Sequence, residues 1–243
     1  MPALPAFLDD DDKEQLTMKR YLTDGEQQRL LRAARGAAGA LAQRDYWWMR
    51  LMLTTGMRVQ ELSLLTAPQA EQALATGWLI VDKRQRKGGK RGNEYVVTES
   101  VRAALAALLE HQRAEPAPAD LDGEPPLVWG RDGKRLSVRS YQARLKDWVR
   151  AAGLDSRVSP HWLRHSRGVN IIARSRSTNP LKVVQLALGH ASIGSSGIYT
   201  QMLREDYERD MHGIDGARMS KRDALRLAAR QQTMRQRGGE VAA

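Results

Sequence analysis

Residues 55–62 of the chain read Thr-Gly-Met-Arg-Val-Gln-Glu-Leu, and residues 161–165 read His-Trp-Leu-Arg-His. In the second segment, the two histidines and the arginine have the i, i+3, i+4 spacing that places side chains on one face of a helix. Histidines at this spacing also occur in zinc sites, but zinc proteases have a glutamate after the first histidine, where this chain has Trp162. The arginine would also repel a cation. A metal site is therefore disfavoured, and a plain histidine-capped helix remains an alternative.

A third segment, Leu188-Gly189-His190, is followed nine residues later by Tyr199. Gly189 is suited to end a helix, and His190 is suited to the turn beyond it. Taken alone, Tyr199 is more typical of a partly buried core residue than of a nucleophile. Arg58, in the first segment, is by itself typical of a surface or capping residue after a helix break. Each segment is a weak signal alone, but the order and spacing of all three together are specific.

The chain has 243 residues and is strongly basic, with 39 Lys and Arg against 28 Asp and Glu and a formal net charge of +11. This surplus favours an anionic partner, nucleic acid first and an acidic membrane second, although ribosomal proteins and other basic surfaces share it. The absence of cysteine excludes disulfides, cysteine-ligated zinc and thiol catalysis, and suits a reducing compartment. The sequence contains no run of about 18 apolar residues and no secretory signal. We therefore expect a cytoplasmic, nucleoid-associated protein without a membrane partner.

Hydrophobic periodicity and turn residues predict an α+β domain that is mainly α-helical and contains one small antiparallel β-sheet. A capping-box pattern at Thr23–Glu26 begins the first helix. Further helices are expected over 41–54, 58–65, 101–112, 137–152, 160–176, 180–189, 196–202 and 203–212. Residues 78–81 and 95–97 predict a hairpin around a basic, glycine-bearing turn, and Leu127-Val128-Trp129 is a candidate third strand.

Composition divides the chain into three parts. Residues 1–20 contain two prolines and an acidic run, and are expected to form a flexible leader. Residues 21–212 hold all three segments and predict the main domain. Residues 213–243 predict a basic helical tail, which is amphipathic and rich in arginine.

Together, the three segments resemble the tyrosine recombinase (phage integrase) family, and the likeness covers about residues 21–212. It implies the catalytic-domain fold of that family, in a short form that resembles the fimbrial phase-switch recombinases. It also implies a set of residues that surround a DNA phosphate, with Tyr199 as the nucleophile that attacks it: Arg58, His161, Arg164 and His190. The family also uses a lysine in the hairpin turn. Aligning residues 86–90, Arg-Lys-Gly-Gly-Lys, with that turn favours Lys87, with Lys90 second.

The residue types in this set suit phosphoryl transfer. Two guanidinium groups can bind the non-bridging oxygens on which negative charge develops in the transition state. A tyrosine with a pKa near 10 is ionised in only about one part in a thousand at pH 7, which costs roughly 4 kcal/mol. His161 is the candidate base for its proton, and by resemblance His190 binds the phosphate and a lysine protonates the departing 5′ oxygen. The product is a covalent 3′-phosphotyrosine, and neither a metal nor a nucleotide cofactor is required.

Basic residues near these segments are expected to bind the phosphates of the DNA backbone. They lie in the hairpin, in the segment before the helix at 137–152 and in the first turn of that helix: Lys83, Arg84, Arg86, Lys90, Arg91, Arg131, Lys134, Arg135 and Arg139. For any one of them, a solvated basic surface is the alternative.

The resemblance implies a site-specific DNA recombinase that acts on double-stranded DNA as a homotetramer on paired sites. A type IB topoisomerase or a telomere resolvase would share the chemistry, and a non-catalytic DNA-binding regulator would share the fold. About 20 residues precede the first expected helix, too few for the additional helical domain that most relatives carry. An accessory DNA-binding protein or a neighbouring protomer is therefore expected to close the other side of the duplex. The tail either docks on a neighbouring protomer, folds back on its own domain or touches DNA.

Overall fold

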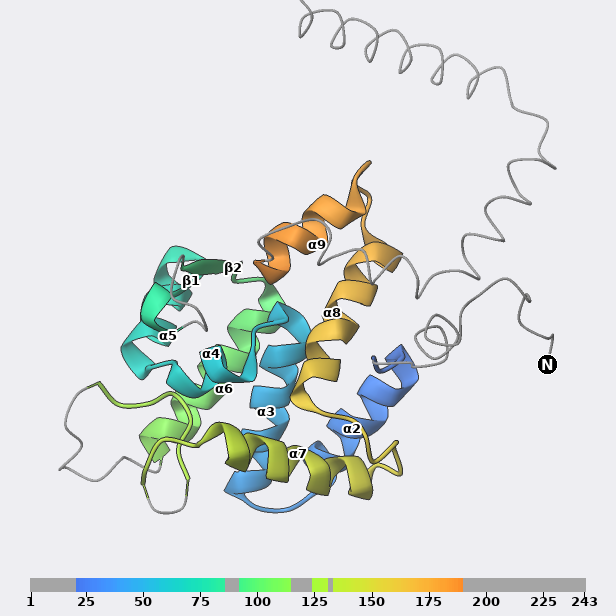
Figure 1. Cartoon of the computed structure of the whole chain (residues 1–243). Coiled ribbons are helices and arrows are strands. Elements are labelled where there is room, and N and C mark those ends of the chain that lie inside the picture. Colours follow the sequence, from blue (N-terminus) through green and yellow to red (C-terminus); the bar gives the residue numbers. More distant parts are fainter. Residues whose placement is uncertain (1–20, 86–91, 115–123, 131–132, 190–243) are drawn as a thin grey trace, which may run out of the picture. The chain divides into compact units, whose positions relative to one another are not determined.

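The computed structural model describes residues 21–85, 92–114, 124–130 and 133–189 (Figure 1). The helices in these ranges are α2 (Asp24–Gly36), α3 (Ala40–Thr55), α4 (Val59–Leu64), α5 (Ala67–Thr76), α6 (Glu99–Ala114), α7 (Val138–Ala151), α8 (Pro160–Arg174) and α9 (Pro180–Leu188). They are joined by strands β1 (Trp78–Val81) and β2 (Asn93–Val96) and by a short 3-10 helix, η1 (Lys83–Gln85). The mainly helical α+β fold is thus confirmed, and α5 is a helix that the sequence pattern does not predict. None of these helices is both long and apolar enough to span a lipid bilayer. The expected helices over 196–202 and 203–212, the leader and the tail lie outside the described residues.

The first two helices start and stop at the predicted signals. Thr23 Oγ1 accepts a hydrogen bond from the Glu26 N–H (3.4 Å) and Glu26 Oε2 accepts one from the Thr23 N–H (2.8 Å), which confirms the capping box of α2. α3 ends at Gly56, whose N–H donates to the carbonyl of Met52 at 2.8 Å. α3 packs against α2, α6 and α8 (Figure 1). Most of its residues are therefore buried.

The two strands form the antiparallel hairpin that the sequence predicts, with Trp78 opposite Val96 and Val81 opposite Asn93. Along β1, alternate residues are buried, so one face of the hairpin joins the core and the other is exposed. The exposed face carries the side chains of Trp78 and Val96. The basic turn that the sequence places between the strands includes residues 86–91, which lie outside the described residues.

The predicted third strand over residues 127–129 is wrong. Among the described residues the sheet has two strands. The segment at 127–129 and the proline before it take part only in isolated bridges, one between Pro126 and Thr66 and one between Trp129 and Arg135. The Leu127 N–H donates to the carbonyl of Leu65 at 2.9 Å, so the segment pairs with the connection between α4 and α5 and not with the hairpin. Pro126, which precedes it, has no N–H with which to extend a ladder.

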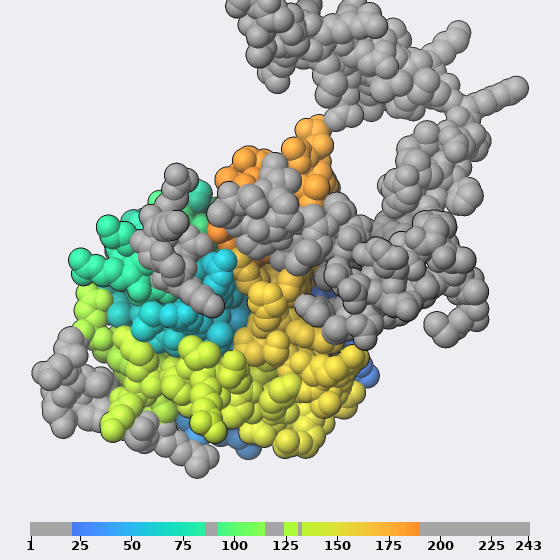
Figure 2. Space-filling model, in the orientation of Figure 1, coloured from blue at the N-terminus to red at the C-terminus, as the bar shows by residue number. Residues whose placement is uncertain are grey.

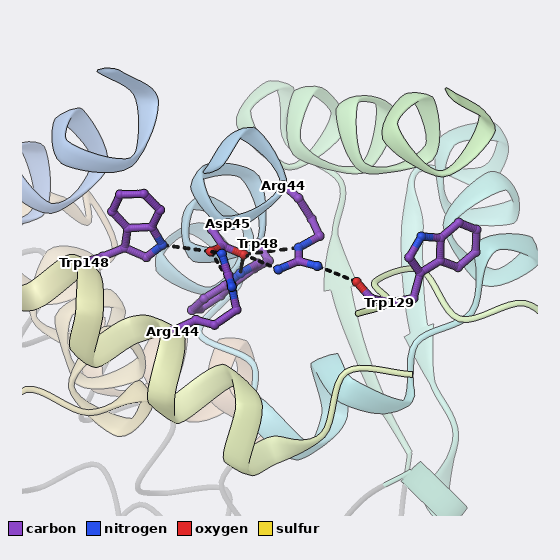
Figure 3. Close-up of polar contacts among 6 residues, drawn as sticks. All are labelled: Arg44, Asp45, Trp48, Trp129, Arg144 and Trp148. Carbon is purple, nitrogen blue, oxygen red and sulfur yellow. Dashed lines mark hydrogen bonds and ion pairs between the residues drawn. The ribbon is translucent and has the colours of Figure 1, made fainter. Parts of the chain in front are cut away.

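A buried network of charged and aromatic side chains joins α3 to α7 (Figure 3). Asp45, on α3, accepts hydrogen bonds from the indole nitrogens of Trp48 and Trp148, each at 2.9 Å. It also pairs with the guanidinium groups of Arg44 and Arg144. Burial raises the pKa of Asp45, but the hydrogen bonds and positive charges of these partners outweigh it, so the pKa is lowered overall. The carboxylate therefore stays ionised and holds α7 against α3.

Arg44 extends this network to the segment that precedes α7. Its Nη1 donates to the backbone carbonyl of Trp129 (Figure 3). In the space-filling view, α7 and the segment before it form the yellow-green surface beside the yellow surface of α8 (Figure 2). The network thus holds α7 through Arg144 and Trp148, and it holds the segment before the helix through the carbonyl of Trp129. The predicted DNA contact Arg139 lies in the first turn of the same helix.

We expect Asp45→Asn to lower the free energy of unfolding by about 3 kcal/mol, because it leaves the buried Arg44 guanidinium without its carboxylate. Urea unfolding followed by tryptophan fluorescence measures this loss. Asp147→Asn is the matched control, since Asp147 pairs with Arg150 on the exposed surface of α7 and its loss costs less than about 1 kcal/mol. Equal losses in the two variants would contradict the role given to the network.

The same carboxylate predicts how this stability depends on pH. The folded-state pKa of Asp45 is below its ordinary value of 3.8, so its contribution is fully present above that value and is lost as the pH falls through the lowered pKa. The difference in unfolding free energy between the wild type and Asp45→Asn is therefore expected to be constant at neutral pH and to shrink below about pH 4. Unfolding measured from pH 7 to pH 2.5 checks this, and a difference that does not change with pH would count against an ionised Asp45.

Candidate active site

The turn between α3 and α4 places Arg58. Gly56 has a φ of +71°, a conformation that favours glycine, and a Cβ there would lie 2.4 Å from Leu188 Cδ2 and 3.0 Å from Arg167 Cγ. Two residues later, Arg58 is the N-cap of α4. The glycine of the first sequence segment therefore does more than break the helix, because it also leaves room for α8 and α9 to approach.

Arg58 is held by Glu61, which lies in the first turn of α4. Glu61 Oε2 accepts a hydrogen bond from the backbone N–H of Arg58 at 2.8 Å, and Oε1 accepts one from Arg58 Nη1 at 3.1 Å. The Glu61 side chain is fully buried, whereas that of Arg58 is 37% exposed. The guanidinium is thus kept at the surface in a fixed orientation. Sequence reasoning gives Glu61 no role, although its i+3 spacing from an N-cap residue is a recognisable signal.

Arg164, on α8, connects all three sequence segments. Its side chain is buried, its Nη1 donates to the carbonyl of Gly56 and its Nη2 donates to the carbonyl of Leu188, each at 2.6 Å. Gly56 lies two residues before Arg58, and Leu188 lies two residues before His190. Because burying a guanidinium is costly unless its donors are satisfied, these hydrogen bonds fix α8 against the ends of α3 and α9.

The two histidines of the second segment are neighbours on α8, as their spacing predicts. His161 is exposed in the first turn of the helix, and its ring meets the ring of His165 edge to face, with centroids 4.3 Å apart. His165 is buried. The start of a helix carries a partial positive charge, so His161 stands where an anion is favoured.

The remaining predicted site residues fall into two groups. Lys83 and Arg84 in η1, Lys134 before α7 and Arg139 in the first turn of α7 are exposed, as DNA contacts must be. The other predicted residues lie outside the described residues: Arg86, Lys87, Lys90, Arg91, Arg131, His190 and Tyr199. The structure therefore brings together the segments that carry Arg58 and Arg164.

Arg135 differs from the expected DNA contact. Its Nη1 donates to the carbonyl of Ser63 at 2.7 Å and to that of Leu65 at 3.3 Å. Burial lowers its pKa. These carbonyls lie at the C-terminal end of α4, where the helix dipole favours a cation. Arg135 is therefore a capping residue for the helix that begins at Arg58.

The base of the hairpin turn is fixed by Gln85. Its Nε2 donates to the carbonyl of Leu64 at 2.7 Å and to Gln69 Oε1 at 3.0 Å, while Gln69 Nε2 donates to Gln85 Oε1 at 2.9 Å. This amide pair attaches η1 to the end of α4 and to α5. Gln69 belongs to the Thr66–Gln69 capping box of α5, but no sequence motif identifies its pairing with Gln85, because a pairing between separate elements has no fixed spacing.

Residues 20–206 match the model of the Phage integrase family. Tyrosine recombinase XerC from Neisseria meningitidis serogroup B is 36% identical over 162 residues, which cover 67% of this chain and 49% of the relative. XerC from Alcanivorax borkumensis is 30% identical over 192 residues, which cover 77% of this chain and 56% of the relative. The chain therefore spans about half the length of these relatives.

Solved structures show the same fold. The crystal structure of XerA recombinase is 26% identical with a TM-score of 0.63, and the match covers 80% of this chain and 66% of that one. The XerH site-specific recombinase bound to its palindromic difH substrate, in a post-cleavage complex, is 22% identical with a TM-score of 0.61, covering 84% and 55%. The predicted catalytic-domain fold is thereby confirmed.

We expect Gly56→Ala to lower the free energy of unfolding by about 3 kcal/mol, because it combines a strained backbone with a clash against Leu188. Gly77→Ala is the matched control, since Gly77 also ends a helix with positive φ but has open space around its Cβ position. Backbone strain alone predicts a loss of about 1 kcal/mol there. Chemical unfolding of both variants measures the difference, and similar losses would show that the close approach is unimportant.

Proposed function

The chain belongs to the phage integrase family of tyrosine recombinases, and we propose that it cleaves and rejoins double-stranded DNA at specific sites. The observation that carries this proposal is the position of Arg164. Its buried guanidinium bonds to the carbonyls of Gly56 and Leu188, so the three motif segments converge at one place. A non-catalytic regulator of the same fold would share this convergence, but it would have no need for the full set of Arg58, His161, Arg164, His190 and Tyr199.

Arg58 and Arg164 supply the positive charge for the scissile phosphate. Guanidinium groups are planar and always ionised, and they stabilise charge that develops on phosphoryl oxygens. Arg58 is partly exposed and oriented by Glu61, so it can reach a bound backbone. Arg164 contributes its positive charge from a fixed, buried position. His161, exposed at the start of α8 on the same helix as Arg164, serves as the base.

The proposed reaction is a phosphoryl transfer to tyrosine. The Tyr199 oxygen forms a bond to phosphorus, the bond from phosphorus to the 5′ oxygen breaks, and Lys87 gives that oxygen a proton. The resulting 3′-phosphotyrosine conserves the energy of the phosphodiester. A 5′-hydroxyl of the same strand or of a partner strand can therefore reverse the step without a metal or a nucleotide.

Double-stranded DNA is the proposed partner, held by exposed basic residues that include Lys83, Arg84 and Arg139. The XerH structure, a recombinase of the same fold, is itself a complex with its difH substrate. We further propose a homotetramer on paired sites, with an accessory protein or a neighbouring protomer closing the far side of the duplex.

Tyr199→Phe is expected to abolish the covalent DNA adduct and to leave DNA affinity within about twofold, because only the nucleophilic oxygen is lost. The substrate is a DNA site obtained by selecting bound sequences from a random library. A denaturing gel with this labelled DNA detects the adduct. Tyr207→Phe is the matched control and should form the adduct normally. Adduct formation by Tyr199→Phe would discard the nucleophile. Relaxation of supercoiled plasmids of any sequence by the wild type would point to a topoisomerase.

Lys87→Ala is expected to slow cleavage by about a hundredfold, because the departing 5′ oxygen loses its acid. A 5′-phosphorothiolate substrate should restore the rate, since a thiolate leaves without a proton. Single-turnover cleavage of both substrates measures this, with Lys90→Ala as the control. Rescue of Lys90→Ala alone would move the general acid to Lys90.

A further inference from the structure

Tyr95, in β2, is a buried phenol to which the proposed reaction gives no direct part. It is the one described residue of β2 whose side chain is fully turned into the core, and only 4% of it is exposed. Its hydroxyl donates a hydrogen bond to Glu61 Oε2 at 2.7 Å. The acceptor is the same carboxylate oxygen that receives the backbone N–H of Arg58.

Glu61 therefore stands between Tyr95 and Arg58. Its Oε2 binds the phenol and the Arg58 N–H, and its Oε1 binds Arg58 Nη1 at 3.1 Å. Burial raises the pKa of Glu61, but these hydrogen bonds and the charges of Arg58 and Arg164 lower it overall. Burial and the charge of Glu61 raise the pKa of Tyr95. The pair is thus an ionised acceptor and a protonated donor.

We propose that Tyr95 is a positioning residue for Arg58: by donating to Glu61 Oε2, it fixes the carboxylate that orients the arginine toward the scissile phosphate. The inference rests on the proposed function. The terminal torsion of a glutamate is broad, so a carboxylate with fewer donors samples more orientations. Removal of the phenol hydroxyl then loosens Arg58 without touching the arginine, the DNA or the nucleophile.

The hairpin is bound to α4 at both ends of that helix. At the start of α4, Tyr95 reaches Glu61, and at its end, Gln85 donates to the carbonyl of Leu64. The strand that returns from the basic turn is therefore joined to the helix that begins at Arg58. Only one residue, Glu61, stands between the hydroxyl of Tyr95 and Arg58.

Tyr95→Phe tests the inference with the loss of one oxygen atom. Single-turnover cleavage of a normal phosphodiester is expected to fall about tenfold, with DNA affinity unchanged, because the arginine is misplaced only relative to the reacting phosphate. The decisive substrate carries a methylphosphonate at the scissile position. It lacks the negative oxygen that Arg58 would neutralise, so the variant should come within about twofold of the wild type on it. An equal penalty on both substrates would mean a merely structural role and overturn the inference.

Tyr46→Phe is the matched control. Tyr46 is also 4% exposed, and its hydroxyl accepts one hydrogen bond, from Arg50 Nη1 at 2.7 Å, away from α4. This variant should cleave both substrates like the wild type. If Tyr95→Phe fails to fold, as circular dichroism would reveal, Glu61→Gln replaces it. That variant keeps the shape of the side chain, and it must show the same methylphosphonate-dependent loss or the inference is wrong.

The wild type separates this inference from the proposed function. If the wild type forms no adduct on selected DNA, the proposed function fails and the position of Tyr95 has no catalytic meaning. If the wild type forms the adduct and Tyr95→Phe forms it at the same rate, only the inference fails.

Discussion

The buried guanidinium of Arg164 is the contact on which the rest of the site depends. Its two acceptors lie 108 and 24 positions away in the chain, yet both carbonyls sit 2.6 Å from it. The ends of α3 and α9 meet α8 at this single cation. A buried charge is tolerated only while its hydrogen-bond acceptors stay in place. The same two hydrogen bonds therefore pack the three helices together and fix the position of the positive charge.

Local signals predict the helix ends well, because caps depend on neighbouring residues alone. The capping box at Thr23 and the glycine stops at Gly56 and Gly189 all lie where the sequence places them. The expected strand at 127–129 does not form, because this segment pairs with the α4–α5 connection and not with the hairpin. Tertiary packing decides this pairing, and local sequence does not show it. α5 is missed although its ends carry local signals of the same kind, a capping box at Thr66–Gln69 and a glycine stop at Gly77.

The motif identifies which segments of the chain meet, but not what holds them together. The partners of Arg164 are backbone carbonyls, which have no identity in a sequence. The contact of Glu61 with Tyr95 and that of Gln85 with Leu64 join separate elements, and these residue types are common. Arg135 has a structural role that the sequence does not predict, since this basic residue near the site binds carbonyls at the end of a helix.

The short helix α4 shows why these contacts are needed. A six-residue helix is not stable alone, because nucleation costs more than so few hydrogen bonds return. Glu61 closes its first turn on Arg58, while Arg135 and Gln85 bind the carbonyls at its other end. The orientation of Arg58 is therefore a product of the surrounding domain.

The acceptors of Arg164 have a practical consequence for engineering. Main-chain oxygens persist whatever side chains surround them, so no exchange of a neighbouring side chain deletes the anchor itself. Exposed positions of η1 and of the first turn of α7 can therefore be varied without removing this anchor. Under the proposed function, such variants change how strongly the DNA backbone is held, while constant residues at 56, 61 and 164 keep the electrostatic scaffold.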